Sequence, residues 1–436
     1  MKKKLSLLMA LVLSLGVFTA CNSNEKAADI SKDAKVEEAS DQAKGDKKDE
    51  KAKTDGQAEI VFWHAMSGGQ GEALEKLTKK FEEENPDIKV TLQNKGKYGD
   101  LNQALVASMQ SPKDLPTITQ AYPDWMLQFK QANMVADLTG YVKSAMNDYD
   151  DILPGIREEI EKEGKIEALP FNKSTEVFWY NKNLYDELGL KEPTSYEELK
   201  ENAKKIHEAK GIPGAGFDSL SNFYLTYLKN KGIDFDAKLD VTCPESIEAI
   251  NYYLDGVKEG YFRIAGTDQH LSGPFANEQV GSFVGSNAGE VYVKEALNGK
   301  FEYAASPYPA AKSFQQGTNI YMFDKESDEE KQAAFRYMQF LASKDAQVEF
   351  AVATGYMPAR KSAVEDDAYK KSDSKIAPIL DKASEKLFSR PLAPGSQKAY
   401  NDMGSLLESI LSNPSADVKA ELEAFAPQFK ADFEEN

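Results

Sequence analysis

Tyrosine residues lie where two predicted strands end, a place where side chains can meet a ligand. Tyr98 follows a strand predicted near residues 88–92, and Tyr122 follows one predicted near residues 117–120. A tyrosine ring can stack on the C–H face of a sugar, and its phenol can hydrogen-bond a hydroxyl group. Such rings also pack inside proteins, so ligand contact and packing both stay open for these two residues.

Other polar residues lie at the end of the first predicted strand, residues 59–64, which leads into a glycine-rich turn. His64 and Ser67 border that turn. A lone histidine is more often structural than a metal ligand. The other two histidines are far from His64 in the sequence: His207 is in a predicted helix and His270 in a predicted loop. We therefore expect no metal site.

A third group of polar residues interrupts the apolar stretch 166–184, which is too long for one ordinary strand. Asn172, Ser174 and Thr175 are short polar residues with apolar neighbours on both sides. A polar group in a buried strand costs free energy unless it has a partner. A bound ligand is one such partner for Ser174, and backbone pairing is the other.

The order of predicted elements explains how these residues would be positioned. The apolar run 59–64, the helical spacing of Leu74, Leu77 and Phe81, and the alternation after Ile88 form a strand, a helix and a strand. Such a unit gives parallel strands with a right-handed crossover, and its loops at the strand C-termini face ligands. We expect an α/β fold with such a sheet, and helices over residues 379–388 and 416–429.

Composition and motifs exclude several classes of function. The formal charge of -18 disfavours nucleic acid, whose phosphates need a basic face. The sequence has no HExxH, nucleophile elbow, P-loop or glycine fingerprint, so we predict no enzyme. A glycosidase-like pair of carboxylates is not excluded by composition, although no pattern selects one.

The first residues indicate export. Residues 1–20 have a lysine-rich start, a short apolar run and small residues before Cys21, as a signal peptide does. The position of Cys21 resembles a bacterial lipobox, in which the cysteine receives lipid; an incidental cysteine is the alternative. Residues 21–58 are predicted to be a flexible tether, because they bury too little apolar surface to fold. We expect an extracytoplasmic protein that is lipid-anchored to the cell membrane.

Several short motifs together resemble the extracellular solute-binding proteins of ABC importers, in the group with maltose-type and glycerol-3-phosphate-type receptors. Their order and spacing carry the resemblance: Phe62-Trp63-His64 before a glycine-rich turn, Lys95-Gly96-Lys97-Tyr98, Leu169-Pro170-Phe171-Asn172-Lys173-Ser174-Thr175, Trp179-Tyr180-Asn181-Lys182-Asn183-Leu184 and Thr354-Gly355-Tyr356-Met357-Pro358. The family implies two discontinuous α/β lobes, joined by hinge strands, that close on a solute and deliver it to permease subunits. On this basis we predict a first lobe of 59–171 plus 317–358 and a second lobe of 172–316 plus 359–436.

The resemblance also implies site residues. It favours Tyr98 as a ligand contact and assigns hydroxyl binding to an acidic residue near Asp124. Tyr224 belongs either to an aromatic wall of the second lobe or to its core. The return crossing is predicted at residues 316–322. The predicted ligand-binding residues are His64, Ser67, Tyr98, Tyr122, Asp124, Asn172, Ser174, Tyr224, Ser286, Gly317, Asn319, Tyr356 and Lys398.

The chemical class of the solute depends on cations. Receptors of the glycerol-phosphate type use an arginine after a Pro-Leu-Pro run, whereas here residues 395–398 lack one and only Lys398, Arg390 or Lys173 could supply the charge. We therefore predict a carbohydrate receptor, with a glycerol-3-phosphate or glycerophosphodiester receptor as the alternative. A surface glycosidase or adhesin has less support. We expect a monomer without a cofactor.

Overall fold

The first part of the fold is a parallel sheet whose alternating side chains are buried on both faces. The computed structural model describes residues 57–390 and 392–434. In its first strand, Ile60 and Phe62 enter one core, and Val61 and Trp63 enter another on the opposite face. This alternation accounts for the continuous apolar run in the sequence. The elements of this part are β1 Ala58–His64, α1 Gly68–Glu84, β2 Ile88–Asn94, α2 Tyr98–Ser108, β3 Ile118–Ala121, α3 Leu127–Gln131, α4 Thr139–Ala145, α5 Pro154–Ile160, β4 Glu161–Lys162, β5 Lys165–Ile166, α12 Asp328–Leu341 and α13 Lys344–Thr354.

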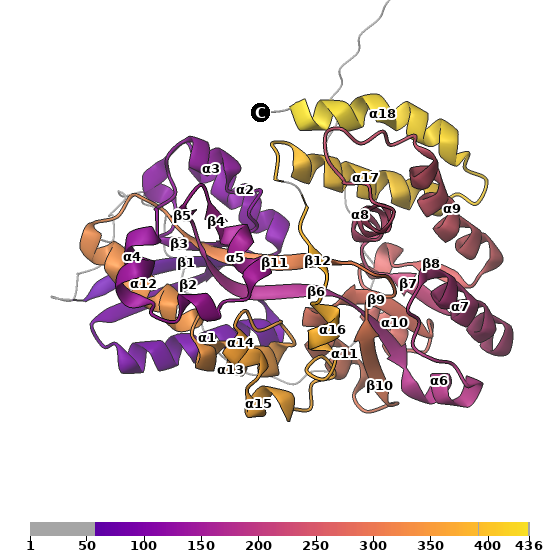
Figure 1. The fold of residues 1–436 in the computed structure, drawn as a ribbon, viewed down its shortest axis with the longest axis horizontal. Coiled ribbons are helices and arrows are strands. Elements are labelled where there is room, and N and C mark those ends of the chain that lie inside the picture. The colour runs from indigo at the N-terminus through magenta and orange to yellow at the C-terminus, as the bar shows by residue number, and fades with distance from the viewer. Residues whose placement is uncertain (1–56, 391, 435–436) are drawn as a thin grey trace, which may run out of the picture. The chain divides into compact units, whose positions relative to one another are not determined.

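Two long strands cross from this part to the second part (Figure 1). Strand β6, Leu169–Asn181, pairs with β11 through its first half and with β9 and β10 through its second half. Strand β11, Ser313–Met322, pairs antiparallel with β3 and β6. The main sheet therefore runs β2-β1-β3-β11-β6-β9-β7-β8 without interruption.

Gly317 is required where the two crossing strands approach each other. Its φ is +89°, and a Cβ added there would lie 2.1 Å from the carbonyl oxygen of Asn172. The register of β11 against β6 shifts between Gly317 and Asn319. Only glycine tolerates both the positive φ and the close contact, so Gly317 has a backbone role in the crossing.

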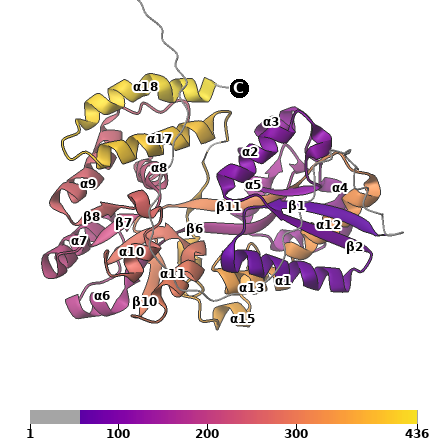
Figure 2. The same ribbon diagram turned by 180° about the vertical axis from the view of Figure 1, so that it is seen from behind.

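In the second part, too, alternate side chains of a strand enter cores on opposite faces of the sheet. Strand β6 now places Phe178 and Tyr180 in one core and Val177 and Trp179 in another. Helices α17 and α18 cover the first of these cores together with α8 and α9 (Figure 2). The elements of this part are α6 Lys182–Leu188, α7 Tyr196–Lys210, β7 Ala215–Phe217, α8 Leu220–Asn230, α9 Pro244–Glu259, β8 Phe262–Ile264, α10 Ser272–Ala276, β9 Ser282–Ser286, α11 Glu290–Leu297, β10 Tyr303–Pro307, α16 Leu380–Ala383, β12 Leu387–Phe388, α17 Ser396–Leu411 and α18 Val418–Glu434. Two short helices, α14 Lys361–Val364 and α15 Asp367–Lys370, instead pack against α13 of the first part.

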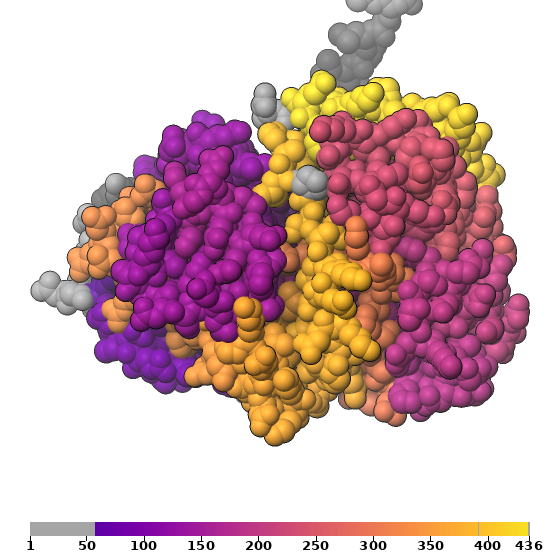
Figure 3. Space-filling model, in the orientation of Figure 1, coloured from indigo at the N-terminus to yellow at the C-terminus, as the bar shows by residue number. Residues whose placement is uncertain are grey.

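The chain after α13 returns to the boundary between the two parts. Figure 3 shows this segment, in gold, between the purple residues of the first part and the magenta residues of the second. Tyr369 and Ile376 of this segment share a core with Trp179 of β6. The segment thus packs on the second half of the crossing strand. The exact lobe boundaries, 59–171 plus 317–358 and 172–316 plus 359–436, stay a prediction.

One predicted element differs from the structure. The helix expected over residues 379–388 is only α16, Leu380–Ala383, and is followed by the short strand β12, which pairs parallel with β11 at Ser313 and Phe314. Pairing with a distant strand outweighs the local helical pattern here. The helix predicted over 416–429 is present and extends to Glu434 with Pro427 inside it.

The predicted signal peptide, the lipidation site Cys21 and residues 21–56 of the tether lie outside the described residues. Among the helices that the structure describes, none combines the length and apolar character that crossing a membrane requires.

Candidate functional site

Three aromatic rings stand together at the strand ends of the first part. Tyr98 begins α2 directly after β2, and Tyr122 and Trp125 follow β3. The ring centroid of Tyr122 lies 5.3 Å from that of Tyr98 and 5.1 Å from that of Trp125, in edge-to-face contacts. The indole Nε1 of Trp125 is buried and has no hydrogen-bond partner in the described structure. Burial raises the pKa of both tyrosines above the ordinary value, so the phenols stay neutral.

A hydrogen-bond network fixes Tyr98 to the crossing strands. The Tyr98 hydroxyl accepts hydrogen bonds from Asn172 Nδ2 at 3.0 Å and from Gln120 Nε2 at 3.3 Å, and it shares a hydrogen bond of 3.3 Å with the Tyr356 hydroxyl. The Asn172 Oδ1 accepts from Gln120 and from Thr318. This network joins β3, β6, β11 and the loop after α13, so Tyr98 is held in one orientation.

A second polar group lies on the second half of β6. Glu176 is 2% exposed, and its Oε1 accepts a hydrogen bond of 3.0 Å from Asn222 Nδ2 of α8. The Asn222 Oδ1 accepts from the Tyr400 hydroxyl of α17 at 2.7 Å. Burial raises the pKa of Glu176 to about 8. The carboxyl is therefore largely protonated in the free protein at pH 7.

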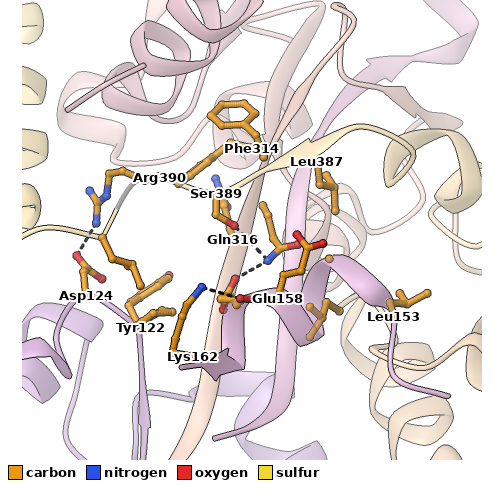
Figure 4. A pocket seen from close by; sticks show the side chains of 18 of the residues that line it. Tyr122, Asp124, Leu153, Glu158, Lys162, Phe314, Gln316, Leu387, Ser389 and Arg390 are labelled. Atoms are coloured by element: carbon orange, nitrogen blue, oxygen red, sulfur yellow. Dashed lines mark hydrogen bonds and ion pairs between the residues drawn. The ribbon is translucent and has the colours of Figure 1, made fainter. Parts of the chain in front are cut away.

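An ion pair connects the two polar groups. Arg390 donates from Nη2 to Asp124 Oδ2 at 2.5 Å and to Gln397 at 2.9 Å, and its guanidinium lies 4.8 Å above the ring of Tyr400. The side chains of Arg390 and Asp124 are 10% and 5% exposed. Figure 4 shows this pair beside Tyr122. The positive charge of Arg390 is thus compensated within the site.

A cavity of about 1230 Å³ opens beside this ion pair. It is lined by Tyr122, Asp124 and Arg390 at one end, and by residues of α5, β11 and β12 (Figure 4). Its size suits a small organic molecule or an oligosaccharide fragment. Across the described residues, no cluster of three His, Cys, Asp or Glu side chains could hold a metal ion.

A family model described as "Bacterial extracellular solute-binding protein" matches residues 76–377. The chain belongs to this family. As its members do, this solute-binding protein acts as a receptor for an ABC importer rather than as an enzyme.

Relatives and solved structures agree with the family. The sn-glycerol-3-phosphate-binding periplasmic protein UgpB of Brucella melitensis is 26% identical over 355 residues, covering 74% of this chain and 81% of that protein. The protein of the same name from Escherichia coli K12 is 26% identical over 374 residues, covering 77% and 82%. UgpB from Mycobacterium tuberculosis in complex with glycerophosphocholine superposes with a TM-score of 0.77 at 24% identity, covering 87% of this chain and 99% of that one. Maltose-bound MalE3 of T. maritima superposes with a TM-score of 0.76 at 22% identity, covering 86% and 99%. The solute-binding protein therefore has the predicted two-lobed fold, in which β6 and β11 join the lobes.

The structure brings six of the predicted site residues into these two connected groups. Tyr98, Asn172 and Tyr356 share hydrogen bonds, and Tyr122 lies against Tyr98. Asp124 pairs with Arg390 beside Tyr122. Ser174 is buried on β6, two residues after Asn172 and on the same face. Sequence reasoning did not find the remaining members, which are Gln120, Trp125, Glu176, Asn222, Thr318, Gln397 and Tyr400. A glutamate inside a strand buried at every position was the one available signal for Glu176.

Three predicted residues at the loops of the solute-binding protein have local roles. His64 is buried, and its Nδ1 accepts a hydrogen bond of 3.2 Å from the Met66 amide. Burial lowers the pKa of His64 to about 4, so the ring is neutral at pH 7. The carbonyl of Ser67 accepts from Tyr292 at 3.4 Å, and the hydroxyl of Ser286 accepts from the Ala288 amide at 3.2 Å. The contacts of His64 and Ser286 are within one loop, whereas the hydrogen bond of Ser67 joins the first part of the fold to α11 of the second.

The structure places three other predicted residues away from the tyrosines. Tyr224 is fully buried in the second-lobe core, where its hydroxyl bonds Ser246 at 2.5 Å. Lys398 of α17 bonds Asp402 at 2.9 Å and pairs with the buried carboxylate of Asp432 in α18. Asn319 donates to Glu159 at 2.7 Å. Gly317, as described above, has a backbone role.

Proposed function

We propose that this receptor captures a neutral carbohydrate, a sugar or an oligosaccharide, outside the cell and delivers it to the permease subunits of an ABC importer. One observation supports a neutral solute: each cationic side chain that could bind a phosphate group already forms an ion pair with a carboxylate. Arg390 is paired with Asp124, Lys398 with Asp432, and Lys173 with Glu159. An anion would have to displace a carboxylate from its partner before it gained a charge-assisted contact.

The surrounding groups suit hydroxyl groups. Neutral phenols, amides and an indole N–H can exchange hydrogen bonds with sugar hydroxyls, while ring faces cover the C–H faces. Tyr98, Tyr122 and Trp125 provide these rings in the first lobe. A neutral polyhydroxylated solute leaves every ion pair of the site intact.

The second candidate is a phosphate ester, sn-glycerol 3-phosphate or a glycerophosphodiester. It is favoured by the names of the curated relatives and by the position of Arg390 at the cavity. In this case Arg390 would leave Asp124 and bind the phosphate.

A double substitution separates the two solute classes. Asp124→Asn with Arg390→Gln replaces the ion pair by two amides that can still bond each other. We expect the affinity for a neutral glycan to stay within about threefold of the wild type, because the two amides can still exchange hydrogen bonds with hydroxyl groups of the solute and no charge of the solute loses a partner. Binding of a phosphate ester through Arg390 would instead weaken by about 1.5 to 3 kcal/mol, or roughly 10- to 150-fold. Titration calorimetry of both proteins measures the difference, and a loss of glycan binding on that scale contradicts the proposal.

We also propose that the receptor is held at the membrane by lipid on Cys21. The sequence around Cys21 and the composition of the tether support this anchor. We expect Cys21→Ala to move the protein from the membrane fraction to the medium or the wash, with unchanged solute affinity in the released protein. Immunoblots of the two fractions measure this, with Cys243→Ala as the matched cysteine control. Retention of the Cys21 variant in the membrane fraction contradicts the anchor.

A further inference from the structure

Glu176 is on the same face of β6 as two predicted site residues. Side chains of a strand alternate between faces, so Asn172, Ser174 and Glu176 point to one side, and four residues span about 13 Å. At one end of this row Asn172 bonds Tyr98. At the other end Glu176 bonds Asn222, whose partner Tyr400 lies beside Arg390. The row therefore runs from the aromatic rings of the first lobe to the polar group of the second.

The carboxyl group of Glu176 is only half satisfied. Its Oε1 accepts from Asn222, whereas its Oε2 is buried and has no hydrogen-bond partner in the described structure. A buried acceptor without a partner costs about 1 to 3 kcal/mol. In the free protein at pH 7 this oxygen carries the proton of the carboxyl group, and in the ionised form it becomes an available acceptor.

The groups that face Glu176 do not compensate its charge. They are Tyr196 of α7, Tyr308 after β10, Tyr400 of α17 and Asp218 after β7. Three of these are phenols and the fourth is an acid. The nearby Arg390 lies over the ring of Tyr400 and is paired with Asp124. A donor from outside the protein would meet the ionised oxygen as an acceptor, whereas an anion would find no unpaired cation among these groups.

We propose that Glu176 is a specificity-determining residue of the solute site, whose unpartnered oxygen accepts a hydrogen bond from an O–H or N–H donor of the solute. This inference rests on the proposed function for the location of the site. It adds that Glu176 selects solutes that have an O–H or N–H donor at this position. Glu176 would then recognise a donor group of the solute from the second lobe, while Tyr98 supplies the ring surface of the first lobe.

Binding of the solute should then be coupled to the release of a proton from Glu176. The pKa of Glu176 is raised to about 8 by burial, so the free receptor holds a proton there at pH 6 to 7. A solute donor stabilises the carboxylate and lowers this pKa, so binding releases a proton and the affinity rises with pH until about pH 8. Full coupling of one proton gives up to tenfold per pH unit.

The test compares Glu176→Gln with the wild type by titration calorimetry in two buffers of different ionisation enthalpy. The probes are maltotriose, its glucosamine counterpart and sn-glycerol 3-phosphate. For each probe that binds, we expect the variant to bind at least tenfold more weakly and to release no proton, while its free energy of unfolding is unchanged or higher. Glu192→Gln, at an exposed position, is the matched control and should behave as the wild type.

The outcomes are distinguishable. Wild-type binding of the glucosamine trimer that is stronger than that of maltotriose, with the preference lost in Glu176→Gln, assigns the donor to an ammonium group; equal binding assigns it to a hydroxyl. Binding of sn-glycerol 3-phosphate alone contradicts the neutral-sugar function but still tests Glu176 through the glycerol hydroxyls. A variant that binds its probe within threefold of the wild type, with the same proton release, overturns the assignment. A loss of stability with unchanged affinity also overturns it, because the residue would then be structural.

Discussion

We expect Tyr98→Ala to weaken binding of a neutral glycan by roughly 100-fold. The substitution removes the ring that would cover a sugar face, and it deprives Asn172 and Gln120 of their common acceptor. Stacking and hydrogen bonds of this kind together are worth about 3 kcal/mol. Titration calorimetry with the tightest-binding glycan measures the loss.

Two further variants separate the contributions of Tyr98. Tyr98→Phe keeps the ring and loses the hydroxyl, so we expect a loss of about tenfold. Tyr141→Ala removes a tyrosine of α4 that stacks on Phe335 outside the site, and it should leave the affinity unchanged. Wild-type affinity in Tyr98→Ala would remove Tyr98 from the site.

We expect Lys173→Met to lower the free energy of unfolding by about 3 to 5 kcal/mol. Lys173 is fully buried, and its Nζ lies 2.6 Å from Glu159 Oε1. The substitution leaves the carboxylate of Glu159, which is 8% exposed, without its charged partner. Urea denaturation followed by circular dichroism measures the change.

The controls show whether the ion pair is the cause. The double variant Lys173→Met with Glu159→Gln removes both charges and should recover most of the stability. Lys204→Met breaks a surface pair with Glu259 and should cost less than about 1 kcal/mol. If Lys173→Met instead leaves stability unchanged and abolishes solute binding, Lys173 is a ligand contact and the phosphate candidate gains support.

The sequence predicts the main strands and helices of the fold well, because these elements depend on local patterns. The buried run of β1, the helix that follows it and the long polar-interrupted strand β6 each have a recognisable period or length. Tyr98 and Asn172 follow from the same patterns, since strand ends and polar interruptions can be read locally. Their mutual hydrogen bond joins residues 74 positions apart, which explains why the pair itself was not predicted.

Sequence reasoning missed some residues, and for others it did not foresee the partner, because the partners are distant in the sequence. Asn222 and Tyr400 meet across 178 positions. Tyr224 is on α8, where eight consecutive residues are buried, so periodicity could not distinguish a core face from a ligand face. Lys398 had the charge expected of a phosphate ligand, but the nearby helix α18 supplies Asp432 as its partner.

We propose above that a neutral carbohydrate binds in this site. Titration calorimetry of the purified receptor with a maltodextrin series, sn-glycerol 3-phosphate and glycerophosphocholine tests it most directly. We expect a neutral glycan to bind with a Kd of roughly 1 μM, worth about 8 kcal/mol, and neither phosphate compound to bind comparably. Tight binding of a phosphate compound, with no response to any glycan, would contradict it.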